Sequence, residues 1–214
     1  MRRLAGVTLI AGSLLFFVGA TMPVNSHVFG TDDALVKLRY IEEDPAAWDL
    51  AMAMLAAGGL TAAIGLVPLA RSVQQVTDRR ILGVIAYGAA TLAIGGAVSW
   101  VIISSIRIAR SPLDVVFVDI SPLLFGTYRV FTRAAFVIFG VVLLLSGYPR
   151  WLGWMLIVVG AMMFADLVAL VLPPFVHYVV FLILGAALLV LRPRPWPGSL
   201  GTAREREPPL APLW

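Results

Sequence analysis

Apolar residues in this chain come in long continuous runs separated by short polar stretches. Each run is close to the ~20 residues that a helix needs to cross ~30 Å of hydrocarbon. The runs do not alternate with polar residues, and lipid offers no hydrogen-bond partners to the backbone, so the expected spanning form is the helix. The pattern predicts an all-α fold, a polytopic transmembrane bundle of six helices, over Leu4–Val24, Ala47–Ala70, Ile81–Ile106, Arg129–Gly147, Trp151–Leu172 and Phe175–Leu191.

The connection between the first two runs has structure of its own. Thr31-Asp32-Asp33 supplies an N-cap and an acidic first turn. We expect a short interfacial helix after it, although Val36, Leu38 and Tyr40 also alternate in the manner of a strand, which remains the alternative. Asp44-Pro45 then has the form of an N-cap and first residue of the second spanning helix.

Two further segments bear on the element boundaries. Ser111-Pro112 and Ser121-Pro122 repeat the helix-start signal before the fourth run, so the earliest expected start of that spanning helix is Pro122. The alternating Arg and Pro residues after Leu191 cannot continue a helix. We therefore expect a transmembrane domain over residues 1–197 and a flexible cytoplasmic tail over residues 198–214, which is polar and rich in proline.

Composition supports a membrane location. The apolar fraction is 60% and the charged fraction 13%, whereas a soluble domain has ~45–50% and ~25%. A water-soluble fold of 214 residues cannot bury that much apolar surface. The formal charge of +4 does not indicate nucleic-acid binding, because the basic residues lie between the apolar runs. The absence of cysteine excludes disulfides, thiol catalysis and cysteine-bound metal sites.

The distribution of Lys and Arg predicts the orientation. With the N-terminus inside, ten of the 16 basic residues lie on the cytoplasmic side, and the acidic residues of the first loop lie outside. We expect a multi-pass protein of the cell inner (plasma) membrane with both termini in the cytoplasm. Met1-Arg2-Arg3 and the apolar run after it also resemble a secretory signal peptide, but we expect this segment to be retained as a helix.

Glycine recurs at seven-residue spacing in five of the predicted helices. Since seven residues make two turns, both members of a pair lie on one helix face, where small residues let helix backbones approach each other in lipid. We therefore expect a packing role for the pairs Gly12/Gly19, Gly58/Gly65, Gly88/Gly95, Gly140/Gly147 and Gly153/Gly160.

A few polar residues lie within or at the ends of the spans and form a candidate polar site. Arg133 and Asp166 are at matched distances from the tight turn near Pro149, and leaving either charge alone in lipid is costly, so we expect an ion pair. The pair either fixes helix register or belongs to a binding or relay site. His177 either lies near the headgroups or approaches Asp166. The candidate site is completed by Arg129 and by Asp49, which also suits the first turn of its helix.

No sequence motif for catalysis, metal binding or nucleotide binding is present. Haem ligation by His27 and His177 is disfavoured, because His27 lies beyond the end of its predicted helix. We predict no catalytic residue, no metal and no cofactor.

The stretch Gly147-Tyr148-Pro149-Arg150-Trp151-Leu152-Gly153-Trp154, leading into Gly160, resembles the turn between the fourth and fifth helices of an uncharacterised bacterial membrane protein family. That family is a domain of unknown function with six predicted helices. The resemblance implies the six-helix fold and no particular activity.

The function expected from the sequence is that of a non-enzymatic integral membrane protein, a small helical bundle or accessory subunit. Its expected partners are membrane lipids, other membrane proteins or a second copy of the chain, and not nucleic acid. The alternative is a bundle that binds or transports a small molecule or ion through a polar pocket on the outer side. A membrane enzyme is the weakest interpretation, because the sequence shows no pairing of a nucleophile with a base.

Overall fold

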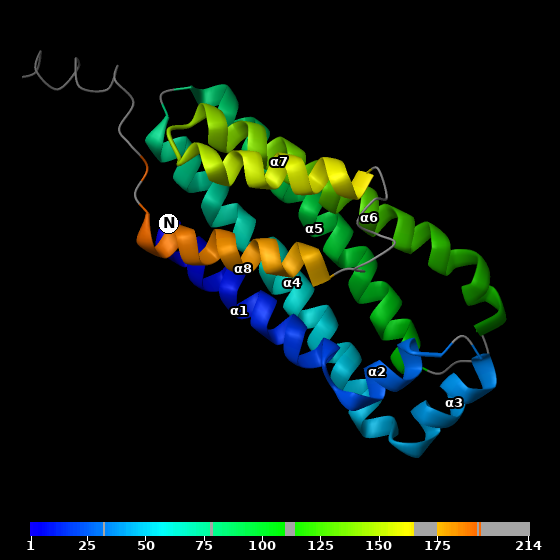
Figure 1. Cartoon of the computed structure of the whole chain (residues 1–214). Helices are drawn as coiled ribbons and strands as arrows, with labels where there is room; N and C mark the ends of the chain where they lie inside the picture. Colours follow the sequence, from blue (N-terminus) through cyan, green and yellow to red (C-terminus); the bar gives the residue numbers. More distant parts are fainter. Residues whose placement is uncertain (32, 78, 110–113, 165–174, 192, 194–214) are drawn as a thin grey trace, which may run out of the picture.

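The computed structural model describes residues 1–31, 33–77, 79–109, 114–164, 175–191 and 193, and within them it is built from α-helices, without a strand (Figure 1). The all-α prediction is confirmed. The helices are α1 (Arg2–Ala20), α2 (Pro23–Phe29), α3 (Ala34–Glu43), α4 (Pro45–Val76), α5 (Arg80–Ala109), α6 (Asp114–Leu145), α7 (Arg150–Phe164) and α8 (Phe175–Val190).

Four of these helices are long and apolar enough to cross a membrane: α1, α4, α5 and the part of α6 from Pro122 to Leu145. α7 and α8 are apolar but shorter, with 15 and 16 residues. The end of the fifth predicted run, up to Leu172, lies outside the described residues. Four candidate spans are therefore shown, and six remain a prediction.

The N-terminal third confirms one loop prediction and corrects a boundary. The first helix ends at Ala20 rather than Val24, because Met22 is extended and Pro23 opens the separate helix α2. α3 is the expected helix, and the strand alternative is wrong. The Asp33 carboxylate caps α3 by accepting a hydrogen bond from the backbone N–H of Leu35 at 2.8 Å. Asp44 caps α4 in the same way.

The candidate span in α6 begins at Pro122, the earliest start that the sequence predicts, but the helix itself begins before it. α6 begins at Asp114 and continues through Pro122. A proline inside a helix removes one backbone hydrogen bond without necessarily ending the helix, because neighbouring groups compensate for the loss in membrane helices. The Ser111-Pro112 signal and the tail over 198–214 lie outside the described residues.

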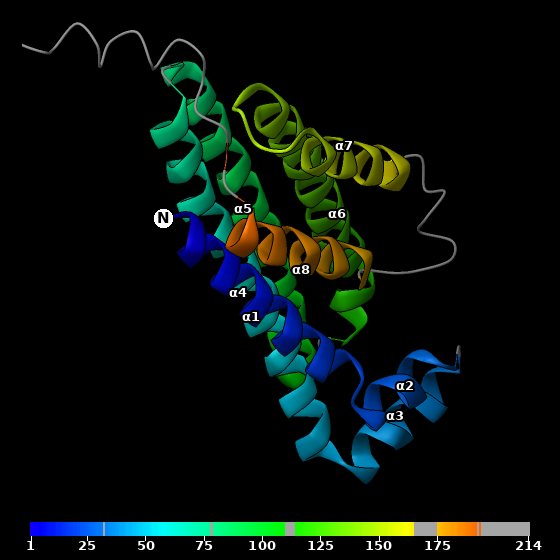
Figure 2. The same cartoon turned by 60° about the vertical axis from the view of Figure 1, so that its left-hand side comes forward.

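The long helices form a curved row in the order α7–α6–α5–α4–α1–α8, each packed against the next (Figures 1 and 2). α7 and α8 touch little, and the row closes instead through aromatic side chains of α6 and α8. α2 and α3 cover one end of the bundle, here named the α2–α3 end. The N-terminus and the α4–α5 and α6–α7 connections lie at the other, named the opposite end.

Glycine permits backbone contact at two of the helix crossings. A Cβ on Gly58 would lie 2.4 Å from the backbone nitrogen of Phe16, and one on Gly140 would lie 2.7 Å from the carbonyl oxygen of Gly153. The packing prediction is confirmed at these crossings. It is wrong for Gly88, which has no atom near its Cβ position, and for Gly147, which lies in the α6–α7 turn with φ 79°.

Candidate binding cavities

Four aromatic residues from four helices meet in the middle of the bundle and form what we call the aromatic layer: Phe16 of α1, Trp100 of α5, Tyr128 of α6 and Tyr178 of α8. The rings of Phe16 and Tyr178 stack with centroids 3.5 Å apart, and those of Trp100 and Tyr128 are 5.2 Å apart. All four side chains are buried. The layer separates two cavities, because each cavity is lined by two of its residues.

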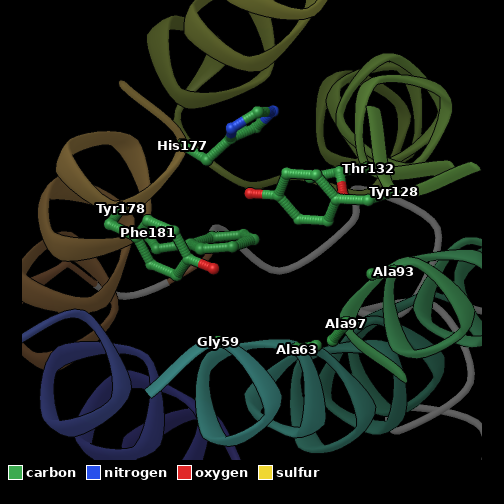
Figure 3. Close-up of a pocket in the computed structure, with 9 residues that line it drawn as sticks. All are labelled: Gly59, Ala63, Ala93, Ala97, Tyr128, Thr132, His177, Tyr178 and Phe181. Carbon is green, nitrogen blue, oxygen red and sulfur yellow. The ribbon is translucent and has the colours of Figure 1, made fainter. Parts of the chain in front are cut away.

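The small cavity is drawn in Figure 3. Its α4 residues follow Leu55 of the large cavity, and its α5 residues precede Trp100, so it lies nearer to the opposite end. It has a volume of about 10 Å³, which is room for one water molecule. Its described walls are Gly59, Ala63, Ala93, Ala97, Tyr128, Thr132, His177, Tyr178 and Phe181.

Polar groups line one side of the small cavity and small residues the other. The side chains of Tyr128, Thr132 and His177 come together opposite the α4 and α5 backbones (Figure 3). Gly59 makes room for the Tyr178 hydroxyl, because a Cβ there would lie 2.8 Å from the hydroxyl oxygen. The buried hydroxyls of Tyr128 and Tyr178 interact with each other across this cavity.

The large cavity has a volume of about 550 Å³ and lies toward the α2–α3 end. That volume falls within the ~300–1,000 Å³ usual for small-molecule sites. Aromatic and aliphatic side chains make up most of its described wall, together with one cation, one amide and one hydroxyl. These lining residues are Phe16, Ala20, Asn25, Ser26, Phe29, Gly30, Leu55, Trp100, Arg107, Phe125 and Phe175.

Arg107 is the cation of the large cavity, and aromatic rings hold its side chain in place. Its guanidinium carbon lies 5.5 Å from the ring centroid of Phe29 and 5.9 Å from that of Trp100, within the range of cation–π attraction. The indole N–H of Trp48 donates to the Arg107 carbonyl at 3.2 Å, which ties the start of α4 to the end of α5. The cation is therefore fixed at the cavity wall.

Asn25 supplies the amide of the large cavity from α2. Its side chain is 2% exposed, and its Nδ2 donates to the carbonyl oxygen of Gly19 at 2.7 Å. Its Oδ1 is buried and meets no donor among the described residues. The N–H groups at Nη1 of Arg107 and Nε1 of Trp100 are likewise buried and meet no acceptor among the described residues. Three residues that line the large cavity thus each carry a buried polar atom without a hydrogen-bond partner in the described part of the chain.

The described residues of the predicted polar site lie on three helices, α4, α6 and α8. His177 is 2% exposed and lines the small cavity between the rings of Tyr128 and Phe136, on the inside of the bundle. Its side chain is turned inward by packing between α6 and α8. Arg133 is 6% exposed, and its guanidinium lies 5.9 Å from the ring centroid of Phe164 on α7.

The other predicted residues lie outside both cavity walls as described. Arg129 lies over the ring of Phe125, at 5.7 Å, and Asp49 is half-buried in the first part of α4. Asp166 falls outside the described residues, so its pairing with Arg133 remains a prediction. Among the described residues, no group of three His, Cys, Asp or Glu is arranged to hold a metal ion.

Sequence reasoning missed Arg107 and Asn25. In the sequence Arg107 is one of the basic residues expected on the outer side, and Asn25 belongs to the connection after the first apolar run. One signal was available for the arginine: Trp100 lies seven residues before it, hence on the same face of α5. No pattern in the sequence linked Asn25 to either residue.

Comparison with known proteins found no matching family model, no similar curated protein and no similar solved structure. The resemblance carried by the segment from Gly147 to Gly160 therefore stays a prediction.

Proposed function

We propose that this chain is a non-enzymatic integral membrane protein that binds a small, largely apolar molecule in the large cavity. The observation that carries the proposal is a cavity of about 550 Å³ whose wall is mostly aromatic and aliphatic and includes Arg107 and Asn25. Sites for small molecules have this composition, an apolar wall with a few fixed polar groups. The cavity favours the binding interpretation over that of a scaffold acting only through protein partners.

In this proposal the six helices α1 and α4–α8 cross the inner membrane, both termini are cytoplasmic, and the α2–α3 end lies outside. The large cavity then opens in the outer half, where a ligand arrives from the periplasmic side or from the outer leaflet. Single cysteines at Glu42 and Gln75, both exposed, test this orientation in a chain that contains no other cysteine. Labelling of both from the same side of the membrane would contradict it.

Filling the large cavity tests the binding proposal. Ala20 of α1 lines the cavity, and Ala11 of the same helix is exposed on the outside of the bundle. We expect Ala20→Phe to remove any small molecule that co-purifies with the protein, as seen by native mass spectrometry, whereas Ala11→Phe retains it. The proposal fails if both variants carry the same molecules in the same amounts, or if the wild-type protein carries none and binds none from a lipid extract.

A further inference from the structure

We infer that the ligand of the large cavity is an amphipathic anion, with an acid head of the carboxylate or phosphate type held by Arg107 and an aliphatic body along the aromatic wall. The inference rests on the proposed function and specifies the ligand class. Its starting point is the electrostatic situation of Arg107, which is a permanent cation because the guanidinium group does not lose its proton in proteins.

Arg107 lies in surroundings that favour an anionic occupant. The described neighbours of its guanidinium are two aromatic rings, and no carboxylate among the described residues pairs with it. Aromatic faces offset part of the cost of taking a cation out of water, but they accept none of its five N–H groups in the plane. Nη1 is buried and has no acceptor among the described residues. A carboxylate or phosphate oxygen meets that need with a charge-assisted hydrogen bond.

Asn25 and Ser26 form the rest of the site proposed for the acid head. Asn25 presents a buried carbonyl oxygen that lacks a donor, and Ser26 adds a hydroxyl to the same wall. An acid head that also carries a hydroxyl, such as a glycerol phosphate, satisfies both Arg107 and the Asn25 oxygen. A purely apolar occupant would leave both polar groups unpaired in a low-dielectric site, which is costly.

The rest of the wall accepts an aliphatic body. Phe16, Phe125 and Phe175 are contributed by three different helices, and Leu55 and Ala20 complete the apolar surface. Arg107 lies in the last turn of α5, so the head lies toward the end of the bundle and the body extends toward the aromatic layer. The polar residues of the large cavity thus lie toward the end of the bundle and the apolar residues lie deeper. This arrangement suits an amphipathic molecule whose head faces the end of the bundle.

The test measures binding to the detergent-solubilised, full-length protein with pairs of probes that differ only in the head. Radiolabelled palmitate is compared with palmityl alcohol, and monoacylglycerol phosphate with monoacylglycerol. We expect each acid to bind at least about tenfold more tightly than its neutral partner, a factor that corresponds to about 1.4 kcal/mol. Equal affinities for the acid and the neutral probe would overturn the inference.

Substitution of the cation locates the effect. Arg107→Gln is expected to weaken binding of the acid probes about tenfold and to leave binding of the neutral probes unchanged. Arg107→Lys is expected to retain part of the preference for the acid probes. The control is Arg39→Gln, since Arg39 lies on α3 with a side chain that is 79% exposed. An undiminished acid preference in Arg107→Gln, with the protein folded by thermal unfolding, would refute the role of Arg107.

Two further arms separate this inference from the proposed function. Inorganic phosphate at millimolar concentration is expected not to displace bound palmitate; displacement would show that a free anion suffices and overturn the amphipathic part. If neither acids nor alcohols bind, and Ala20→Phe changes nothing, the proposed function itself fails. If both classes bind equally and Ala20→Phe abolishes both, the function stands and the anionic ligand class is wrong.

Discussion

The α1–α4 interface and the α6–α8 interface are built on opposite principles, although the helices belong to the same bundle. α1 and α4 meet through glycine, so that backbone lies on backbone at Gly12 and Gly58. α6 and α8 meet through rings, with the centroids of Phe136 and Phe181 4.9 Å apart. Rings hold the helix axes apart, and the space between irregular side chains is not filled completely. Both cavities lie beside the aromatic interface between α6 and α8. The volume of the interface residues therefore decides where this bundle is tightly packed and where it contains cavities.

The largest expected effect on stability follows from introducing a side chain into the α1–α4 interface. In Gly58→Leu the new side chain would overlap the α1 backbone, which cannot move away without separating the helices. We expect a loss of stability above ~3 kcal/mol and little folded protein on size-exclusion chromatography. Gly88→Leu is the control, because Gly88 has no atom within 4 Å of its Cβ position. A well-folded Gly58→Leu protein would show that the crossing is not tight.

An intermediate effect is expected beside the small cavity. Gly59→Ala places a methyl group 2.8 Å from the Tyr178 hydroxyl oxygen, and the ring of Tyr178 is fixed by its stack on Phe16. The ring must shift, so we expect a destabilisation of ~1–3 kcal/mol in thermal or denaturant unfolding. Gly83→Ala is the matched control, because its neighbour is the flexible side chain of Gln74. Equal stability of the two variants would mean that the ring of Tyr178 can shift without cost.

The smallest expected effect concerns a hydrogen bond at the opposite end. The hydroxyls of Ser72 on α4 and Tyr148 in the α6–α7 turn are 2.8 Å apart, and both side chains are buried. Burial raises the pKa of Tyr148 above its usual value, so the neutral, hydrogen-bonding form persists at physiological pH. We expect Tyr148→Phe and Ser72→Ala each to cost ~1 kcal/mol.

The double variant Ser72→Ala/Tyr148→Phe distinguishes a real pair from two independent losses. If the hydroxyls bond to each other, the double change costs less than the sum of the single changes in unfolding measurements. Strict additivity would indicate that the hydroxyls do not interact, and that the opposite end is held by packing alone.

The sequence was sufficient for what depends on local chemistry. Runs of apolar residues located the long helices, since length and hydropathy alone decide whether a segment suits a bilayer. Asp44 was identified as the N-cap of α4, and the cap of α3 was located within Thr31-Asp32-Asp33, because capping involves only the next three residues. The extent of α6 was missed at Pro122, because continuation of a helix through proline depends on compensation from outside the segment.

The tertiary structure alone decided which polar residues share a site. Matched distances from the turn near Pro149 grouped Arg133 with Asp166, whereas the position of Arg133 beside Phe164 of α7 and of His177 in the wall of the small cavity depends on the rotation of each helix about its axis. Depth can be counted along a sequence, whereas rotation is set by how neighbouring helices pack. For the same reason the sequence determined that Arg107 is a cation near a helix end, and only the packing of α2, α5 and α8 determined that it lines a cavity.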